Sequence, residues 1–271
     1  MSQLDPAIIE AYRRDGAVVL RGVFERHWLK SIARGIERNF VDPGPGAMRY
    51  TPEGEPGGFY DDYCNWKRIE EYRRFAFDSP AAGLVGALMG SSEVRFYHEH
   101  VIVKEPGTRE LTPWHHDLPY YGLEGSQLCS LWLPLDPVPR SVCPQFVATS
   151  HRWGRRFVPR KFVDHEEYGE VPEGYEPAGD IDAQLEGQTI LSWGLEPGDC
   201  IAFHMLAVHG APGTQELRTR RRGFVTRWLG DDVRFAARPW KTSPPFEEVD
   251  LQPGDRMNHP SFPLVSRASS D

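Results

Sequence analysis

The stretch Pro113-Trp114-His115-His116-Asp117-Leu118 places an imidazole and a carboxylate two positions apart. On an extended backbone, alternate side chains leave the same face, so His115 and Asp117 would point together and His116 would point the other way. Another histidine, His209, follows 92 residues after Asp117, just past an apolar run. Two imidazoles and one carboxylate leave three positions open on a metal ion, which is the arrangement that non-haem iron(II) oxygenases need.

The same residues are also compatible with a site that binds no metal. His-Asp pairs are common on protein surfaces, and a histidine on a strand is more often packed or hydrogen-bonded than bound to a metal. His98 and His100 also alternate on one strand face, but no carboxylate of matching register accompanies them, so we expect them to be structural. The motif alone leaves both interpretations open.

The pattern of apolar residues predicts helices first and strands afterwards. An N-capped helix is expected over 5–16, a short strand over 17–20, and further helices over 25–39, 66–75 and 80–89, with a Pro- and Gly-rich loop over 42–58. Short β-branched and aromatic runs then predict strands of a sandwich or barrel over 94–103, 128–135, 145–148, 189–191, 200–203 and 223–229. The fold class is therefore mainly β with flanking helices.

The composition is that of a soluble globular chain. Of the 271 residues, 39% are hydrophobic and 26% are charged. No run approaches the roughly 18 apolar residues that span a bilayer, and the acidic start is not a secretory leader, so we expect a cytoplasmic location and no membrane partner. The four cysteines are widely spread without a CxxC pair, which indicates reduced thiols.

The net charge of −8 comes from one segment. Residues 164–186 hold nine acidic side chains and no Lys or Arg, and without them the charge would be +1. With no basic stripe elsewhere, we expect no nucleic-acid partner.

The acidic segment belongs to a connection at about 162–187 that we expect to act as a lid. Its carboxylates would repel a polyanion, which favours a small or cationic substrate over a coenzyme A thioester. An aromatic cluster earlier in the chain either lines the substrate pocket or packs in the core: Phe59, Tyr60, Tyr63 and Trp66.

Several further motifs occur in a fixed order around these histidines. They are Lys104-Glu105-Pro106-Gly107, Tyr120, Trp132, Ser150-His151-Arg152-Trp153-Gly154, Gly198-Asp199, Phe203-His204, His209-Gly210 and Arg220-Arg221. In this order and spacing, from about residue 5 to residue 229, the chain resembles the phytanoyl-CoA dioxygenase family. The resemblance implies a double-stranded β-helix, which is a cupin-like jelly roll. It further implies a dioxygenase that uses Fe(II), O₂ and 2-oxoglutarate, hydroxylates an unactivated C–H bond of a small-molecule metabolite, and releases succinate.

The resemblance also implies a domain plan. We expect a single dioxygenase domain over 1–271, with a helical part at about 1–90, a β core at about 91–235 and the acidic, lid-like insert at about 162–187. One domain also suits a chain of this length. The sequence carries no signal for the oligomeric state.

Carried over position by position, the resemblance makes His115, Asp117 and His209 the iron ligands. His116 stands where relatives usually carry glutamine, so we expect it to be a hydrogen-bonding neighbour of the ligands. No further catalytic residue is indicated.

The cosubstrate contacts implied by the resemblance are Arg220, Lys104 and Trp132. Arg220 stands eleven residues after His209, where the family places the arginine that binds the far carboxylate of 2-oxoglutarate through two parallel hydrogen bonds. Each position also has an ordinary structural interpretation. Arg220 would belong to a solvated cationic run, Lys104 would be a surface lysine, and Trp132 would be part of the core.

Two departures from the family pattern affect the cosubstrate. Relatives often have Ser directly after the His-Gly pair and again two residues after the carboxylate-binding arginine, whereas this chain has Ala211 and Arg222. Contacts from those two hydroxyls would be missing. Two alternatives therefore stay open: an iron or zinc enzyme of the same fold that does not use 2-oxoglutarate, and a non-catalytic binding module.

Overall fold

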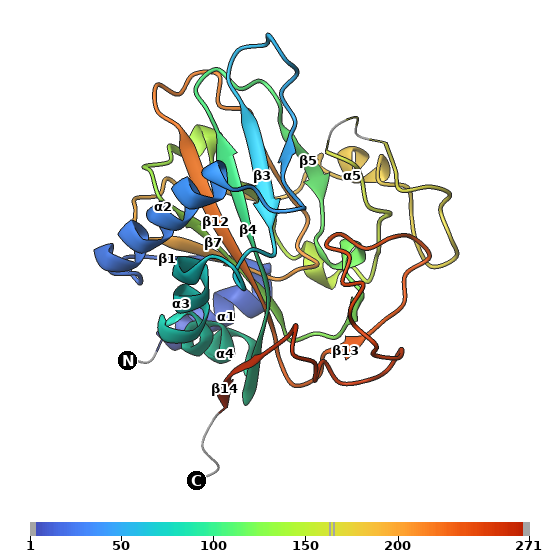
Figure 1. Ribbon diagram of the computed structural model, residues 1–271. Coiled ribbons are helices and arrows are strands. Elements are labelled where there is room, and N and C mark those ends of the chain that lie inside the picture. Colours follow the sequence, from blue (N-terminus) through green and yellow to red (C-terminus); the bar gives the residue numbers. More distant parts are fainter. Residues whose placement is uncertain (1–3, 163, 165, 268–271) are drawn as a thin grey trace.

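Two antiparallel sheets pack face to face at the centre of the computed structural model, which describes residues 4–162, 164 and 166–267 (Figure 1). In spatial order, the larger sheet consists of β1 (Ala17–Leu20), β10 (Cys200–Phe203), β7 (Leu128–Pro134), β12 (Arg221–Leu229), β4 (Glu93–Lys104), β3 (Phe59–Tyr63) and β2 (Met48–Arg49), and β14 (Leu264–Arg267) also pairs with β4. The smaller sheet consists of β5 (Thr112–His115), β11 (His209–Ala211), β8 (Gln145–Val147) and β9 (Ile190–Leu191). A separate pair is formed by β6 (Leu123–Glu124) and β13 (Arg234–Phe235).

Four helices cover the outer face of the larger sheet (Figure 1): α1 (Pro6–Asp15), α2 (Arg26–Val41), α3 (Glu70–Asp78) and α4 (Ala81–Met89). On α2, Ile32 and Ile36 are fully buried at helical spacing. Phe75 of α3 meets Phe224 of β12 with 5.4 Å between ring centroids. The outward side chains of β12 thus form the main core with the helices, which leaves its inward side chains for the space between the two sheets.

The predicted helices and strands are largely confirmed, and the differences have local causes. The Asp5 carboxylate accepts a hydrogen bond from the Ala7 backbone N–H, and Gly16 ends α1 with φ 79°. The helix expected over 66–75 begins only at Glu70, because the backbone N–H groups of Asn65 and Trp66 donate to the buried Glu99 carboxylate instead.

Strand β3 was missed. Its sequence, Phe-Tyr-Asp-Asp-Tyr, contains two carboxylates, and aspartate is depleted in strands. The register with β4 nevertheless places Asp61 opposite Ile102 and Tyr63 opposite His100. Asp62 faces the other way, where its Oδ2 accepts a hydrogen bond of 2.7 Å from the Asn39 side chain of α2.

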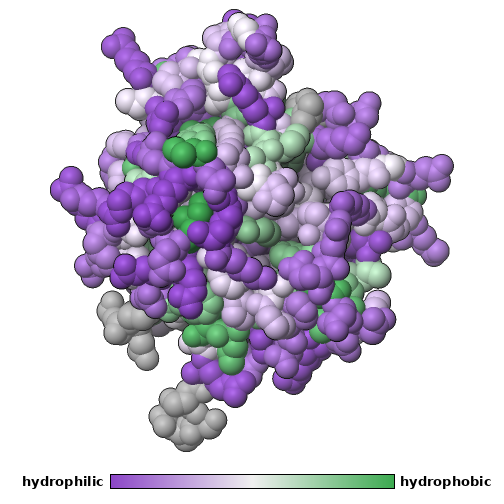
Figure 2. Space-filling model, in the orientation of Figure 1, coloured by the Kyte–Doolittle hydropathy of each residue, from purple (hydrophilic) through white to green (hydrophobic). Residues whose placement is uncertain are grey.

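The surface is mostly hydrophilic in the view of Figure 2, and the hydrophobic patches on it are small and separated. Only a few large apolar side chains are exposed among the described residues, with Val41 the most exposed at 87%. None of the helices in the described part of the chain is long and apolar enough to cross a membrane.

Candidate metal centre

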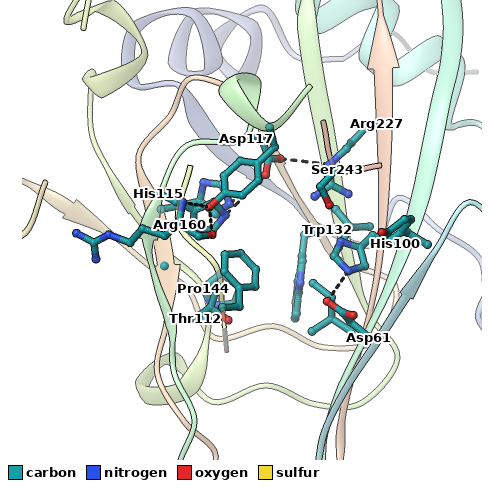
Figure 3. A pocket seen from close by; sticks show the side chains of 18 of the residues that line it. Asp61, His100, Thr112, His115, Asp117, Trp132, Pro144, Arg160, Arg227 and Ser243 are labelled. Carbon is teal, nitrogen blue, oxygen red and sulfur yellow. Dashed lines mark hydrogen bonds and ion pairs between the residues drawn. The ribbon is translucent and has the colours of Figure 1, made fainter. Parts of the chain in front are cut away.

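A cavity lies between the inner faces of the two sheets (Figure 3). Its wall includes His115 and His209 from the smaller sheet, and Arg221 and Arg227 from β12 of the larger one. Residues that are far apart in the sequence therefore converge on one enclosed space.

The three predicted ligands meet at this cavity. Strands β5 and β11 pair antiparallel with His209 directly opposite His115, and Asp117 follows two residues after β5 ends. The Nε2 atoms of His115 and His209 lie 3.7 Å and 3.9 Å from Asp117 Oδ1. One ligand atom from each residue lies within 4.8 Å of the others, and no other such group of three occurs among the described residues. This spacing suits a single ion bound by all three.

Backbone carbonyls set the tautomers of the two histidines. His115 Nδ1 lies 2.8 Å from the Pro113 carbonyl oxygen, and His209 Nδ1 lies 2.9 Å from that of Ala207. A carbonyl oxygen only accepts, so each Nδ1 carries the proton and each Nε2 keeps a free lone pair toward Asp117. Both imidazoles are thus oriented for metal binding.

Asp117 has one oxygen held by the protein and one directed at the imidazoles. Its Oδ2 accepts from Arg227 Nε at 3.3 Å and from the Ser130 hydroxyl at 3.4 Å. Burial by itself would raise the pKa of Asp117, but the Arg227 guanidinium holds that pKa well below its usual range. The carboxylate is therefore ionised at neutral pH, and Oδ1 is available to a cation.

One extended backbone was expected to bring His115 and Asp117 together, and this does not hold at Asp117. Asp117 has a helical backbone conformation, with φ −69° and ψ −40°, and begins a short 3₁₀ turn (Leu118–Tyr120), so it does not continue the strand. His116 does point away, as predicted, and its Nε2 accepts a hydrogen bond of 2.9 Å from the Phe157 backbone N–H.

Burial favours the neutral imidazoles that a metal site requires. It lowers the pKa of His115 to about 3, with a further contribution from His209, and it lowers the pKa of His209 as well. Two neutral imidazoles and one carboxylate form a donor set that suits a divalent transition metal.

Two adjacent arginines, Arg220 directly before β12 and Arg221 as its first residue, lie on opposite faces of the sheet. Arg221 is 3% exposed and lines the cavity, where it donates a hydrogen bond to the Val142 carbonyl oxygen. Arg220 lies on the opposite face, where its guanidinium pairs with Glu105 at 2.7 Å and stands over the Phe40 ring. Arg221, and not Arg220, is thus among the described residues that line the cavity, because the count of eleven residues from His209 crosses a loop and does not preserve the phase of the strand.

The two positions that depart from the family pattern, Ala211 and Arg222, lie on different sides of the cavity wall. Ala211 lines the cavity, whereas Arg222 points away from it and pairs with Asp136 at 2.7 Å. If the pattern is counted from Arg221, which lines the cavity, the position two residues later is Gly223. An added Cβ there would lie 2.9 Å from the Trp132 ring.

Trp132 and Lys104 have different surroundings. Trp132 lines the cavity, as a cosubstrate contact would. Lys104 is fully buried but is not among the described residues that line the cavity, and its Nζ donates to the Glu110 carbonyl oxygen at 2.9 Å. Burial lowers the pKa of Lys104 well below its usual value. The structure therefore does not present Lys104 to a bound cosubstrate.

One polar group in the cavity was missed in the sequence. His100 Nε2 lies 3.0 Å from Asp61 Oδ2, which also accepts a hydrogen bond of 2.8 Å from the Tyr50 hydroxyl. The expectation that no carboxylate accompanies His100 was wrong, because that carboxylate comes from the neighbouring strand β3. If the run Phe-Tyr-Asp-Asp-Tyr had been read as a strand, the alternation of side chains would have placed Asp61 on the same face as Tyr63.

The beginning of the acidic insert covers the metal centre. The Phe162 ring lies 5.0 Å from the His115 ring, and Tyr168 lies 5.6 Å from Tyr120, measured between centroids. Beyond them, the insert consists of turns and the short helix α5 (Asp180–Ala183). None of the described acidic side chains of 164–186 lines the cavity, so this part of the segment does not control the charge of a ligand there.

Sequence comparisons connect the chain to known proteins. A family model described as phytanoyl-CoA dioxygenase (PhyH) matches residues 12–222. A curated protein of Caenorhabditis elegans named "Probable phytanoyl-CoA dioxygenase" is 23% identical over 177 residues, which cover 64% of this chain and 51% of the relative. The match thus spans about half the length of that relative.

Solved structures share the fold. The non-haem alpha-ketoglutarate-dependent carbocyclase SnoK from nogalamycin biosynthesis has a TM-score of 0.78 and 21% identity, with 97% of each chain covered. EctD from S. alaskensis, solved with 2-oxoglutarate and 5-hydroxyectoine, has a TM-score of 0.71 and 16% identity, with 98% of this chain and 88% of that chain covered. At these identities the likeness is one of fold, and it confirms the predicted cupin-like architecture.

Proposed function

The chain belongs to the phytanoyl-CoA dioxygenase family, and on this premise we propose that it is an Fe(II)- and 2-oxoglutarate-dependent dioxygenase. Its reaction is the hydroxylation of an unactivated C–H bond in a small-molecule metabolite. When bound, iron and 2-oxoglutarate together supply the oxidant from O₂, and 2-oxoglutarate is decarboxylated to succinate. The remaining work belongs to the side chains around the cavity.

His115, Asp117 and His209 would hold the iron. Their fit rests on the free Nε2 lone pairs and the free Asp117 Oδ1, which all face one point in a buried site. Because three protein ligands leave three positions open, a chelating cosubstrate and O₂ have room on the same ion.

The observation that carries the proposal is the buried charge of Arg221. Burial lowers its pKa only to about 10, so the guanidinium is a cation at neutral pH. No carboxylate in the described part of the chain forms an ion pair with it. A buried cation without a counter-ion is costly, and the far carboxylate of 2-oxoglutarate would supply that counter-ion at the cavity wall.

Anaerobic mixing with Fe(II) and 2-oxoglutarate tests this assignment. We expect the weak visible charge-transfer band of the iron chelate, and we expect no such band when Zn(II) replaces Fe(II). Exposure to ¹⁸O₂ should then place one labelled oxygen in succinate. A missing band at saturating concentrations, or succinate without label, would favour a metalloenzyme that does not use 2-oxoglutarate.

The same proposal extends to the binding partner and the cellular location of the enzyme. Its partner is a small molecule, and we propose a cytoplasmic location. That location is supported by four cysteines that are all unpaired, as expected in a reducing compartment.

A further inference from the structure

The geometry points to Asp61 as the anchor for a basic nitrogen of the substrate, so that the enzyme oxidises a small ammonium-bearing molecule. This inference rests on the proposed function, which it deepens by naming the substrate class. Asp61 reaches the cavity from β3 of the larger sheet, across the cavity from the metal ligands of the smaller one (Figure 3).

The two oxygens of Asp61 differ in their hydrogen bonds. Oδ2 receives both protein donors, the Tyr50 hydroxyl at 2.8 Å and His100 Nε2 at 3.0 Å. Oδ1 is buried, and among the described residues nothing donates to it. A buried carboxylate oxygen without a donor is rare in folded proteins, because the lost hydration is not replaced. The missing donor would therefore come from a ligand in the cavity.

The surroundings of Asp61 favour a cationic donor over a neutral one. Tyr50, Tyr63 and Tyr168 line the same part of the cavity, and aromatic rings beside a carboxylate form an environment that attracts ammonium groups. Burial and the Asp61 charge raise the pKa of Tyr50, so its hydroxyl stays neutral and donates.

None of the three arginines of the cavity wall forms an ion pair with Asp61 among the described residues. Arg227 is paired with Asp117, Arg221 is the proposed partner of 2-oxoglutarate, and a guanidinium nitrogen of Arg160 donates to the Ala178 carbonyl oxygen, with the group turned away from the cavity in Figure 3. In the described part of the chain, no Lys or Arg forms an ion pair with Asp61. A substrate held by its nitrogen at Asp61 would direct its remaining carbon atoms toward the metal centre.

The test compares amines with alcohols of the same carbon skeleton. We would titrate the anaerobic protein, loaded with Fe(II) and 2-oxoglutarate, with benzylamine and benzyl alcohol, 2-phenylethylamine and 2-phenylethanol, and cyclohexylmethylamine and cyclohexylmethanol. Calorimetry gives each affinity, and the visible band reports whether the probe reaches the metal centre. Each amine should bind about 10- to 100-fold more tightly than its alcohol, which corresponds to one charge-assisted hydrogen bond.

Variants then assign this preference to one carboxylate. Asp61→Asn keeps the size of the side chain and an acceptor for Tyr50, and it should lower amine affinity by about the same 10- to 100-fold while 2-oxoglutarate binds as before. Asp136→Asn is the matched control, because Asp136 pairs with Arg222 away from the cavity. This control should leave amine binding unchanged.

Two results would overturn the inference. One is an affinity for amines no greater than for alcohols in the wild-type protein, including the case in which no probe binds. The other is an amine preference that survives in Asp61→Asn. Because the wild-type comparison comes first, an unstable variant does not remove the test. Failure of the proposed function looks different, since the iron chelate would then not form before any amine is added.

Discussion

His115 and His116 are neighbours in the chain, yet their rings have different tasks, and the difference is set by single hydrogen bonds. The Nε2 of His115 is free because Nδ1 donates to a carbonyl, whereas the Nε2 of His116 is occupied by the Phe157 backbone N–H. His209 repeats the arrangement of His115. The protein contact at the second ring nitrogen therefore separates a metal ligand from a structural histidine.

The first prediction concerns His209. His209→Ala should abolish turnover and lower Fe(II) affinity at least about tenfold, because two ligands do not hold a labile divalent ion well. Anaerobic Fe(II) titration measures this directly. The control is His116→Gln, whose amide can still accept from Phe157 and which should bind Fe(II) nearly as the wild type does. Greater damage in His116→Gln would mean that the wrong histidine has been assigned.

The second prediction concerns the two arginines. Arg221→Leu should bind Fe(II) normally but need much more 2-oxoglutarate, because losing one partner of a buried charged contact costs roughly 2–5 kcal/mol. Arg220→Leu removes only a partly exposed pair with Glu105 and should change 2-oxoglutarate affinity little. The affinity is measured by titrating the visible chelate band. If Arg220→Leu proved the weaker binder, the cosubstrate contact would have to be reassigned to it.

At the scale of elements, β12 connects the two ends of the cavity. It carries Arg221 toward the proposed cosubstrate position and Arg227 toward Asp117, on the inward face of one strand. Between them, Gly223 leaves room for the Trp132 ring of the neighbouring strand β7. The absence of a side chain at this point lets an indole form the cavity wall beside Arg221.

The third prediction tests this close approach. In Gly223→Ala the new Cβ would stand 2.9 Å from the Trp132 ring, so the indole or the strand must shift. Overpacking of this kind costs typically about 1–3 kcal/mol of folding stability, and we expect 2-oxoglutarate affinity to fall with it. Calorimetric unfolding and chelate titration measure the two effects. Gly179→Ala is the control, since nothing lies within 4 Å of its added Cβ. Unchanged stability and affinity in Gly223→Ala would show that Trp132 does not define the wall.

At the scale of the whole molecule, iron and 2-oxoglutarate would connect the two sheets. The smaller sheet and the residues directly after it contribute His115, His209 and Asp117, while the larger sheet contributes Arg221 and Arg227. A ligand that binds only when both sheets are in place stabilises the folded state according to its concentration and affinity.

The fourth prediction follows from this connection. At 100 times its dissociation constant, a ligand specific to the folded state adds about 2.7 kcal/mol to the free energy of unfolding, so the melting temperature should rise by several degrees. We expect one increment with Fe(II) and a second with 2-oxoglutarate in anaerobic calorimetry. Arg221→Leu should keep the first increment and lose most of the second. His209→Ala should lose both, and retention of both would contradict the assigned site.

The sequence by itself predicted what depends on short-range chemistry. Helix caps such as Asp5 and Gly16 and the apolar runs of β1 and β10 act locally, so their elements were predicted nearly to the residue. The His-x-Asp pair was visible for the same reason. Its partner His209 lies 92 residues away, so spacing made it a candidate and the order of motifs that the family shares supported it.

Which side chains share the cavity depends on how the strands pair in the folded protein. Arg221 lines the cavity and Arg220 does not, because the register between β12 and β4 sets the strand phase and a loop separates that strand from His209. Asp61 meets His100 because β3 pairs with β4, a contact between positions 39 residues apart. A slip of one residue turns every side chain of a strand to the other face. Spacing along the chain therefore cannot determine such contacts, and strand pairing does.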